Sequence, residues 1–290
     1  MKNLCRSAIP AAMLSAVILL AFVQPMPAQV KPTLVGTTGA CNNLVQGGPC
    51  TQTSTLVQID SETGALVRVI GPVGFTVNGL AWDGRSKTLF ASTSVGDTLF
   101  HGLITINLNT GAGKIVNKKV VNFGLAIDQG TSGSPIHSIT VDSAGNMVGW
   151  YDEFGPAGTF DTFVQINKKS GVATEFTNTG INTSQNGLSF SNFNLLWNID
   201  SPRAVGGVCC VQTAYLLDPG TGKPVTSTQL SPPTNAALGD FNPVDNFYYG
   251  LNFTPFSAPT TFFVRVDPLA GTVTTVGQTA DDLHAIAFIK

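Results

Sequence analysis

The stretch LVQIDSETGALV, Leu56 to Val67, contains a short alternating strand that ends in an aspartate, followed four residues later by a glycine. The same pattern returns in LITINLNTGAGK from Leu103, FVQINKKSGVAT from Phe163, AYLLDPGTGKPV from Ala214 and FVRVDPLAGTVT from Phe263. An Asp or Asn side chain accepts hydrogen bonds from the backbone just ahead of it, and glycine adopts the positive φ that closes a tight turn. The pattern therefore predicts five β-hairpins.

A second pattern alternates with the first along the chain. It comprises VNGLAWD at Val77, IHSITVD at Ile136, QNGLSFS at Gln185, TNAALGD at Thr234 and LHAIAFI at Leu283. These copies begin 59, 49, 49 and 49 residues apart. A repeat of about 50 residues with about four strands is typical of a β-propeller. We therefore expect an all-β, five-bladed propeller with four-stranded blades.

The fifth blade is expected to combine the two ends of the chain. Residues 283–290 supply its innermost strand and residues 33–75 supply the other three. Ile286 and Phe288 should then pair with the segment around Leu34 and Val35, because such closure removes the exposed edges of an open array.

The N-terminus is predicted to be a secretory signal peptide, residues 1–28, followed by a single propeller domain, residues 29–290. Lys2 and Arg6 precede an apolar run from Ala11 to Val23, which is shorter than the roughly 20 residues of a membrane-spanning helix. We expect a secreted or periplasmic protein without a transmembrane segment after cleavage near Ala28. An uncleaved anchor is the alternative.

The composition argues against nucleic acid as a partner. Charged residues make up 11% of the chain and the formal net charge is -2, so no basic surface is available for a polyanion. We expect a monomer, and the sequence identifies no cofactor.

Four cysteines follow the predicted signal peptide, and export would place them in an oxidising compartment. Cys41 and Cys50 enclose a short loop and are expected to pair. Cys209 and Cys210 are adjacent, and form either a vicinal disulfide or cross-links to the first two, since four cysteines allow three connectivities. The spacings match no zinc motif.

Two short motifs suggest activities that their surroundings do not support. A phosphate-binding loop built on GTGK, residues 220–223, would need glycine where Leu217 stands and Ser or Thr where Pro224 stands. GTSGSP resembles the nucleophile segment of chymotrypsin-like proteases through Ser132, but His101, the only upstream histidine, lacks the flanking residues of such a site.

The residue that opens each innermost strand is polar in all five repeats: Asn78, His137, Asn186, Asn235 and His284. Strand direction places all five on the loop-rich face, the face that carries the longer connections, around the mouth of the central channel. Imidazole and amide groups can hold water, polar ligand groups or a transition metal, whereas a ring without carboxylates holds Ca²⁺ poorly. The alternative is that these side chains bond the neighbouring blade and lock the repeat.

Other polar and aromatic residues are candidate ligand contacts, and each also has a purely structural interpretation. Trp150, Tyr151 and Trp197 near the second strands suit a sugar or peptide ligand, or packing between blades. A further group, expected to brace turns at the ends of the innermost strands, comprises Asp83, Asp142 and Asp240.

The IDxxTG and GLAWD motifs resemble the YVTN, NHL and lactonase-like propeller repeats of secreted bacterial proteins, over nearly all of the mature chain. The resemblance implies the propeller fold, on which binding scaffolds, lactonases and lyases all occur.

We therefore expect an exported, non-catalytic binding or scaffold propeller that recognises a small molecule, glycan or protein on its loop-rich face. The alternative is a lactonase- or glycosidase-like hydrolase or lyase, with or without metal assistance. Its acid and base groups would come from Asp152, Glu153, Asp200 and Asp282.

Overall fold

The computed structural model describes residues 31–39, 53–93, 102–125, 136–151, 160–181, 183, 186–200, 212–232, 237–253 and 261–290. Residues 32–290 form one compact unit. The predicted signal peptide and all four of the cysteines expected in disulfides lie outside the described residues. Within the described ranges, no helix has the length and apolar character needed to span a membrane.

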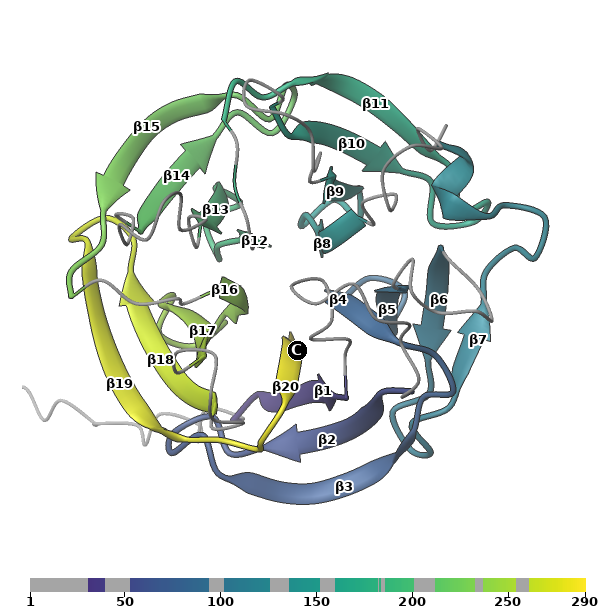
Figure 1. Ribbon diagram of the computed structural model, residues 1–290, viewed down its shortest axis with the longest axis horizontal. Helices are drawn as coiled ribbons and strands as arrows, with labels where there is room; N and C mark the ends of the chain where they lie inside the picture. The colour runs from purple at the N-terminus through teal and green to yellow at the C-terminus, as the bar shows by residue number, and fades with distance from the viewer. Residues whose placement is uncertain are drawn as a thin grey trace, which may run out of the picture. The chain divides into compact units, whose positions relative to one another are not determined.

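The described strands form five antiparallel sheets of four strands, arranged as a ring, which confirms the predicted five-bladed propeller (Figure 1). From the innermost strand outward, the blades are as follows: blade 1, β4 (Val77–Asp83), β5 (Thr88–Thr93), β6 (Leu103–Ile106) and β7 (Gly113–Ile115); blade 2, β8 (Ile136–Val141), β9 (Met147–Tyr151), β10 (Thr162–Ile166) and β11 (Ala173–Asn178); blade 3, β12 (Asn186–Phe190), β13 (Leu196–Asp200), β14 (Thr213–Leu217) and β15 (Pro224–Gln229); blade 4, β16 (Ala237–Phe241), β17 (Tyr248–Phe253), β18 (Thr261–Asp267) and β19 (Thr272–Gln278); blade 5, β20 (Leu283–Ile289), β1 (Thr33–Thr38), β2 (Thr55–Ile59) and β3 (Leu66–Pro72). A short 3-10 helix, η2 (Asn122–Gly124), follows blade 1.

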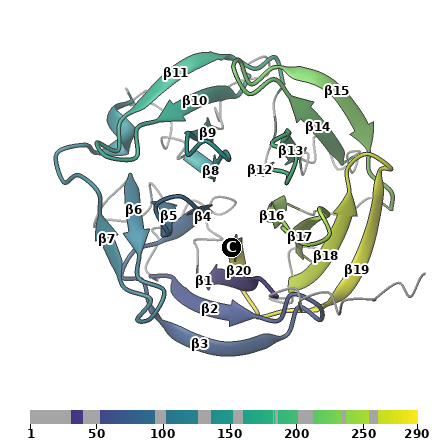
Figure 2. The ribbon, with the colours of Figure 1, turned by 180° about the vertical axis from the view of Figure 1, so that it is seen from behind.

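Blade 5 closes the ring as predicted, because β20 pairs antiparallel with β1. Leu34 lies opposite Phe288, and Gly36 lies opposite Ile286. Each innermost strand contacts the innermost strands of both neighbouring blades, so the ring has no gap. Figures 1 and 2 show this ring from its two sides.

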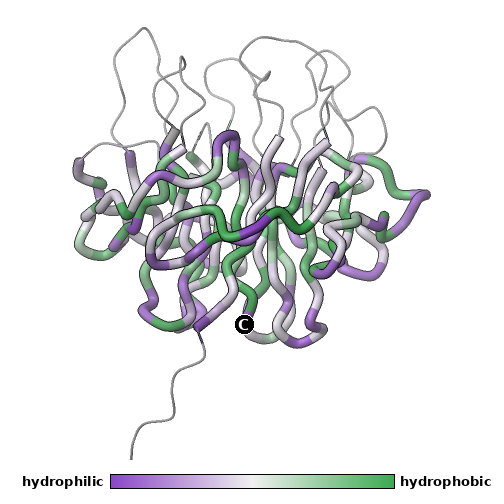
Figure 3. Tube along the Cα trace, turned by 90° about the horizontal axis from the view of Figure 1, so that it is seen from below, coloured by the Kyte–Doolittle hydropathy of each residue, from purple (hydrophilic) through white to green (hydrophobic). Residues whose placement is uncertain are grey.

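The five predicted hairpin turns all form between the third and fourth strands of a blade. In the first, the N–H groups of Glu62 and Thr63 donate to Asp60 Oδ1, and Gly64 adopts φ +76°. The other four turns repeat this geometry around Asn107, Asn167, Asp218 and Asp267. These turns and the short turns after the innermost strands share one face, the turn face, where the C-terminus also lies (Figure 3).

The hydrophobic core lies between the blades rather than within them. Five clusters of buried apolar side chains each combine residues from two neighbouring blades, one cluster at every interface of the ring. At the closing interface, Phe288 of blade 5 packs edge-to-face on Tyr249 of blade 4, with ring centroids 5.7 Å apart. Alternation along a strand makes this arrangement natural, because the two faces of each sheet both meet a neighbouring blade.

Polar side chains also join neighbouring innermost strands. Ser138 Oγ accepts a hydrogen bond from Leu188 N at 3.0 Å, and Thr140 Oγ1 accepts one from Phe190 N. These bonds satisfy edge N–H groups that no strand pairs with on the inner side of the ring, and thereby help to hold the blades in register.

The expectation that three aspartates brace the turns after the innermost strands is correct for two of them and wrong for Asp240. Asp83 and Asp142 do accept hydrogen bonds within those turns. In blade 4, however, Asp240 pairs with Tyr249 inside the blade, and Asn242 takes the turn position, where its Oδ1 accepts a hydrogen bond from Val244 N. Within the register shift of β16, Leu238 adopts a φ of +55°, which is rare for a residue other than glycine.

Candidate functional site

Three residues of the predicted polar ring are the second residues of the innermost strands of three consecutive blades: His284 in β20, Asn78 in β4 and His137 in β8. All three are buried, with 3% to 7% of their surface exposed. The structure thus brings these residues to the loop-side end of the inner strands, as the strand directions predicted. For Asn186 only the backbone is described, as the first residue of β12, and Asn235 lies outside the described residues.

Each of these three residues is the extra residue of a β-bulge. In blade 1, Val77 lies opposite Thr93 and Gly79 lies opposite Ser92, so Asn78 has no residue opposite it. The register shifts in the same way around His137 in blade 2 and around His284 in blade 5. Bulges redirect side chains and recur next to functional sites.

The bulges change which side chains face the core. Val77 and Leu80 belong to one hydrophobic cluster although they are three residues apart, which plain alternation would forbid. Ile136 and Ile139 share a cluster in the same way, as do Leu283 and Ile286. The bulge thereby keeps the polar residue out of the hydrophobic cluster to which the apolar residues on both sides of it belong.

The residue after each bulged position is small: Gly79, Ser138 or Ala285. A Cβ atom on Gly79 would come within 2.7 Å of the carbonyl oxygen of His137. Neighbouring innermost strands therefore approach closely at this level of the ring, and only a small side chain fits between them.

The two histidines are neutral at physiological pH. Burial, together with the nearby His284 imidazole, lowers the pKa of His137 to about 3. Burial lowers the pKa of His284 to about 4. The innermost strand of Asn78, β4, lies between the strands of the two histidines, β8 and β20, in the ring.

Asn78 adds an amide to this group, and its Nδ2 is buried without a hydrogen-bond partner among the described residues. A buried amide donor without a partner is costly, so such a group indicates a ligand or water. Among the described residues, no three His, Cys, Asp or Glu side chains come together as a metal-binding group.

Two of the aromatic candidates lie on the strand next to His137, since in β9 Trp150 pairs with Ser138 and Tyr151 pairs with Ile136. Trp150 is fully buried, and its indole N–H donates to Asp161 Oδ2 at 3.0 Å and to Thr183 Oγ1 at 3.1 Å. Trp197 is buried in the cluster between blades 3 and 4. Both tryptophans are core residues, so we leave them out of the candidate site; Tyr151 is half-buried at the edge of the cluster between blades 1 and 2.

The acidic candidates of the enzyme hypothesis are not assembled by the described residues. Asp152 and Glu153 lie outside these residues. Asp200 is buried at the end of β13 in blade 3, and Asp282 precedes β20 in blade 5, with blade 4 between them in the ring. The carbonyl of Asp282 accepts a hydrogen bond from Gly39 N.

A pocket of about 290 Å³ lies at the turn-face end of the inner strands and receives side chains from all five blades. Its lining includes two acidic residues, Asp142 and Asp240, and Asp240 accepts hydrogen bonds from Ser189 Oγ at 2.6 Å and from Phe288 N at 2.9 Å. Burial raises the pKa of Asp240, against the opposing effects of Lys290 and these hydrogen bonds. Because the carboxylate joins three innermost strands, its role in this pocket is structural.

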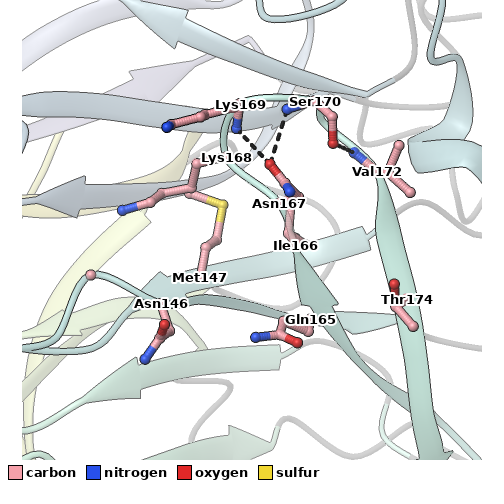
Figure 4. Close-up of a pocket in the computed structure, with 11 residues that line it drawn as sticks. Asn146, Met147, Gln165, Ile166, Asn167, Lys168, Lys169, Ser170, Val172 and Thr174 are labelled. Atoms are coloured by element: carbon pink, nitrogen blue, oxygen red, sulfur yellow. Dashed lines mark hydrogen bonds between the residues drawn. The ribbon is translucent and has the colours of Figure 1, made fainter.

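The larger cavity, about 720 Å³, lies against the turn of blade 2 (Figure 4). Its polar groups are used within the structure: Asn167 Oδ1 accepts from Lys169 N and Ser170 N, and Lys168 forms an ion pair with Asp83. No signal in the sequence pointed to this cavity. Its polar side chains stabilise the turn that it lies against.

The fold and the site together define a five-bladed β-propeller with imidazole and amide groups at the loop-side end of its inner strands. No protein-family model matches the sequence, and no curated protein matches it either. Solved structures similar to the chain include TolB from Acinetobacter baumannii, at 14% identity and a TM-score of 0.48, with 87% of this chain and 54% of that chain covered. This chain therefore spans about half the length of TolB.

Two further similar structures carry lactonase descriptions. A gluconolactonase from Xanthomonas campestris is 12% identical with a TM-score of 0.43, and 90% of each chain is covered. A putative 6-phosphogluconolactonase from Bacteroides uniformis is 13% identical with a TM-score of 0.43, and 87% of this chain and 83% of that chain are covered. These values say nothing about ligand or activity, and the propeller fold that the repeats predicted is confirmed by the five four-stranded sheets themselves.

Proposed function

We propose that this protein is an exported, non-catalytic binding propeller whose ligand site is the polar ring at the loop-side end of the inner strands. The observation that carries the proposal is the bulge repeated at Asn78, His137 and His284. A polar residue that only filled space would not need the same break in strand pairing in three blades, whereas a site that gathers side chains does.

The chemistry of the ring favours binding over catalysis. A general acid or base works best with a pKa near the working pH, and the pKa values of His137 and His284 are about 3 and about 4. Neutral imidazoles and amides instead suit a polar, uncharged or metal-containing ligand.

The size and position of the ring suggest a small ligand, or one projecting group of a glycan or protein. Blades 5, 1 and 2 supply the described ring residues, and the sequence adds Asn186 and Asn235 from blades 3 and 4. A ligand on the axis would therefore contact every blade, and its binding would stabilise the whole ring.

A thermal-shift screen of the mature protein against metal ions, sugars and small polar compounds tests this proposal. A ligand should raise the melting temperature of the wild type and leave that of the His137→Asn/His284→Asn variant unchanged. Lys169→Ala, in the turn-face cavity, is the matched control and should respond like the wild type. A ligand response that is lost in Lys169→Ala and kept in the histidine variant would contradict the proposal.

A further inference from the structure

The pocket of about 290 Å³ at the turn-face end of the inner strands contains a hydrogen-bond donor that the fold does not use. Trp82, in β4, lines this pocket, and its indole Nε1 is buried without a hydrogen-bond partner among the described residues. The other two tryptophans lie in the core, where the indole N–H of Trp150 has two acceptors. A buried donor without an acceptor is costly, so the indole of Trp82 indicates that a bound molecule accepts from it.

The space beside this N–H group is open. Gly84 follows in the turn after β4 and also lines the pocket. Apart from its chain neighbours, a Cβ atom built on Gly84 would have a single heavy atom within 4 Å, the Nε1 of Trp82 at 3.7 Å. Another heavy atom can therefore lie next to the indole nitrogen without displacing the protein.

We propose that this pocket binds one uncharged, polyhydroxylated residue, a monosaccharide that is either free or the end of a glycan, with a hydroxyl oxygen accepting from Trp82 Nε1. The site is separate from the polar ring, because Asn78 lies near the start of β4 and Trp82 near its end. The inference therefore adds a second ligand site to the proposed function and does not depend on it.

The charges of the lining favour an uncharged ligand. Two of the lining side chains are basic, Arg85 and Lys290, and two are acidic, Asp142 and Asp240. An anion would meet the acidic groups and a cation would meet the basic groups, with a repulsion in either case. An indole N–H can only donate, so the ligand must supply the acceptor, and a hydroxyl group does so without carrying a charge.

The size and the mixed surface of the pocket suit a single sugar. Ligand pockets range from about 300 to 1,000 Å³, so a pocket of about 290 Å³ takes a small molecule. Its lining combines buried apolar side chains, such as Ile139 and Phe288, with the exposed amides of Asn192 and Asn194. A sugar presents C–H groups as well as hydroxyls, and an aromatic ring beside polar groups can contact both.

Nuclear magnetic resonance of isotope-labelled mature protein tests the inference, because the three tryptophans give three indole N–H signals. Trp82→Phe assigns the signal of Trp82 by removing it. Titration with glucose, galactose, mannose and N-acetylglucosamine should shift this signal for at least one sugar and leave the other two indole signals in place. Sulfate and Ca²⁺, the charged probes, should not shift it.

Calorimetry then gives the affinity of the variants for the same sugar. Trp82→Phe keeps an aromatic ring and loses the donor, so it should weaken binding roughly fivefold to tenfold. Gly84→Leu fills the space beside the indole and should weaken binding at least as much. Lys169→Ala, in the larger cavity, is the matched control and should bind like the wild type. An oligosaccharide that ends in the same sugar should bind more tightly than the free sugar if a glycan is the ligand, and less tightly if the free sugar is.

Near-ultraviolet circular dichroism of each sugar-free variant checks its fold, and Gly84→Leu decides the matter if Trp82→Phe does not fold. The inference is overturned if no sugar shifts the Trp82 signal, or if both variants keep the affinity of the wild type. Sugar binding that is lost in His137→Asn/His284→Asn and kept in Trp82→Phe would assign the sugar to the polar ring, so the proposed function would stand and this inference would fail. Binding that is kept in the histidine variant and lost in Trp82→Phe supports the turn-face site, whatever ligand the ring takes.

Discussion

Replacing Phe288 with alanine tests whether the closure of the ring carries the stability of the fold. Phe288 is in the last strand, is 0% exposed, and belongs to the cluster between blades 4 and 5. Removing a buried phenylalanine side chain costs about 3–5 kcal/mol, from lost burial and from the cavity left behind. The main-chain hydrogen bond from Phe288 N to Asp240 Oδ2 stays in place, so the substitution removes packing alone.

That loss is a large part of a total stability of roughly 5–15 kcal/mol. For a chain of this size, 1 kcal/mol corresponds to about 2–4 °C in melting temperature, so Phe288→Ala should melt about 6–20 °C lower. Urea unfolding followed by fluorescence gives the free energy directly, with an unchanged slope. A chain truncated after residue 282 loses Leu283 and Ile286 as well and should not fold.

Phe193→Ala is the matched control, because Phe193 is 75% exposed in the turn after β12. An exposed substitution changes stability by no more than about 0.5 kcal/mol. If Phe288→Ala and Phe193→Ala melted within about 2 °C of each other, less than the shift expected from 1 kcal/mol, the closure would not be what holds the ring together.

Three further predictions follow from particular residues. Gly111→Ala should lower the free energy of unfolding by about 1–3 kcal/mol more than Gly74→Ala. Both glycines have φ near +80°, but only at Gly111 would the new Cβ meet a carbonyl oxygen, 2.4 Å away. Equal losses of unfolding free energy for the two variants in urea would argue against this close approach. Burial lowers the pKa values of His137 and His284, so these residues contribute a stability that is complete above about pH 6.5 and is lost as the pH falls towards about 4. The free energy of unfolding should be roughly 4 kcal/mol lower at pH 5 for this reason, and a double His→Asn variant should not show this loss between pH 7 and 4. Burial raises the pKa of Asp83, but the hydrogen bonds it accepts outweigh this and lower the pKa overall, so its stabilisation is present above about pH 4 and is lost on further acidification; an Asp83→Asn variant with the same acid unfolding profile as the wild type would contradict this.

The repeated turns and the number of blades were predictable from the sequence because they depend on local chemistry. An Asp or Asn followed by glycine makes the same turn wherever it occurs, as the geometry around Asp60 and Gly64 shows. The closure was predictable too, since a lone strand before Lys290 and three strands near Leu34 have no other partners in a closed ring. The positions of Asn78, His137 and His284 near the start of their innermost strands followed from strand direction alone.

Only the tertiary structure decided what the side chains at these positions do. A register shift depends on how one strand packs on its neighbours, so the bulges at His137 and His284 and the displacement of Asp240 left no local signal in the sequence. The same holds for Trp150. Its predicted place near the loop-rich face suggested a binding surface, but the structure buries its side chain and its indole N–H donates to Asp161, so it is a core residue. Local turn chemistry thus determined the architecture, while burial and the approach of neighbouring blades determined which polar groups lie together.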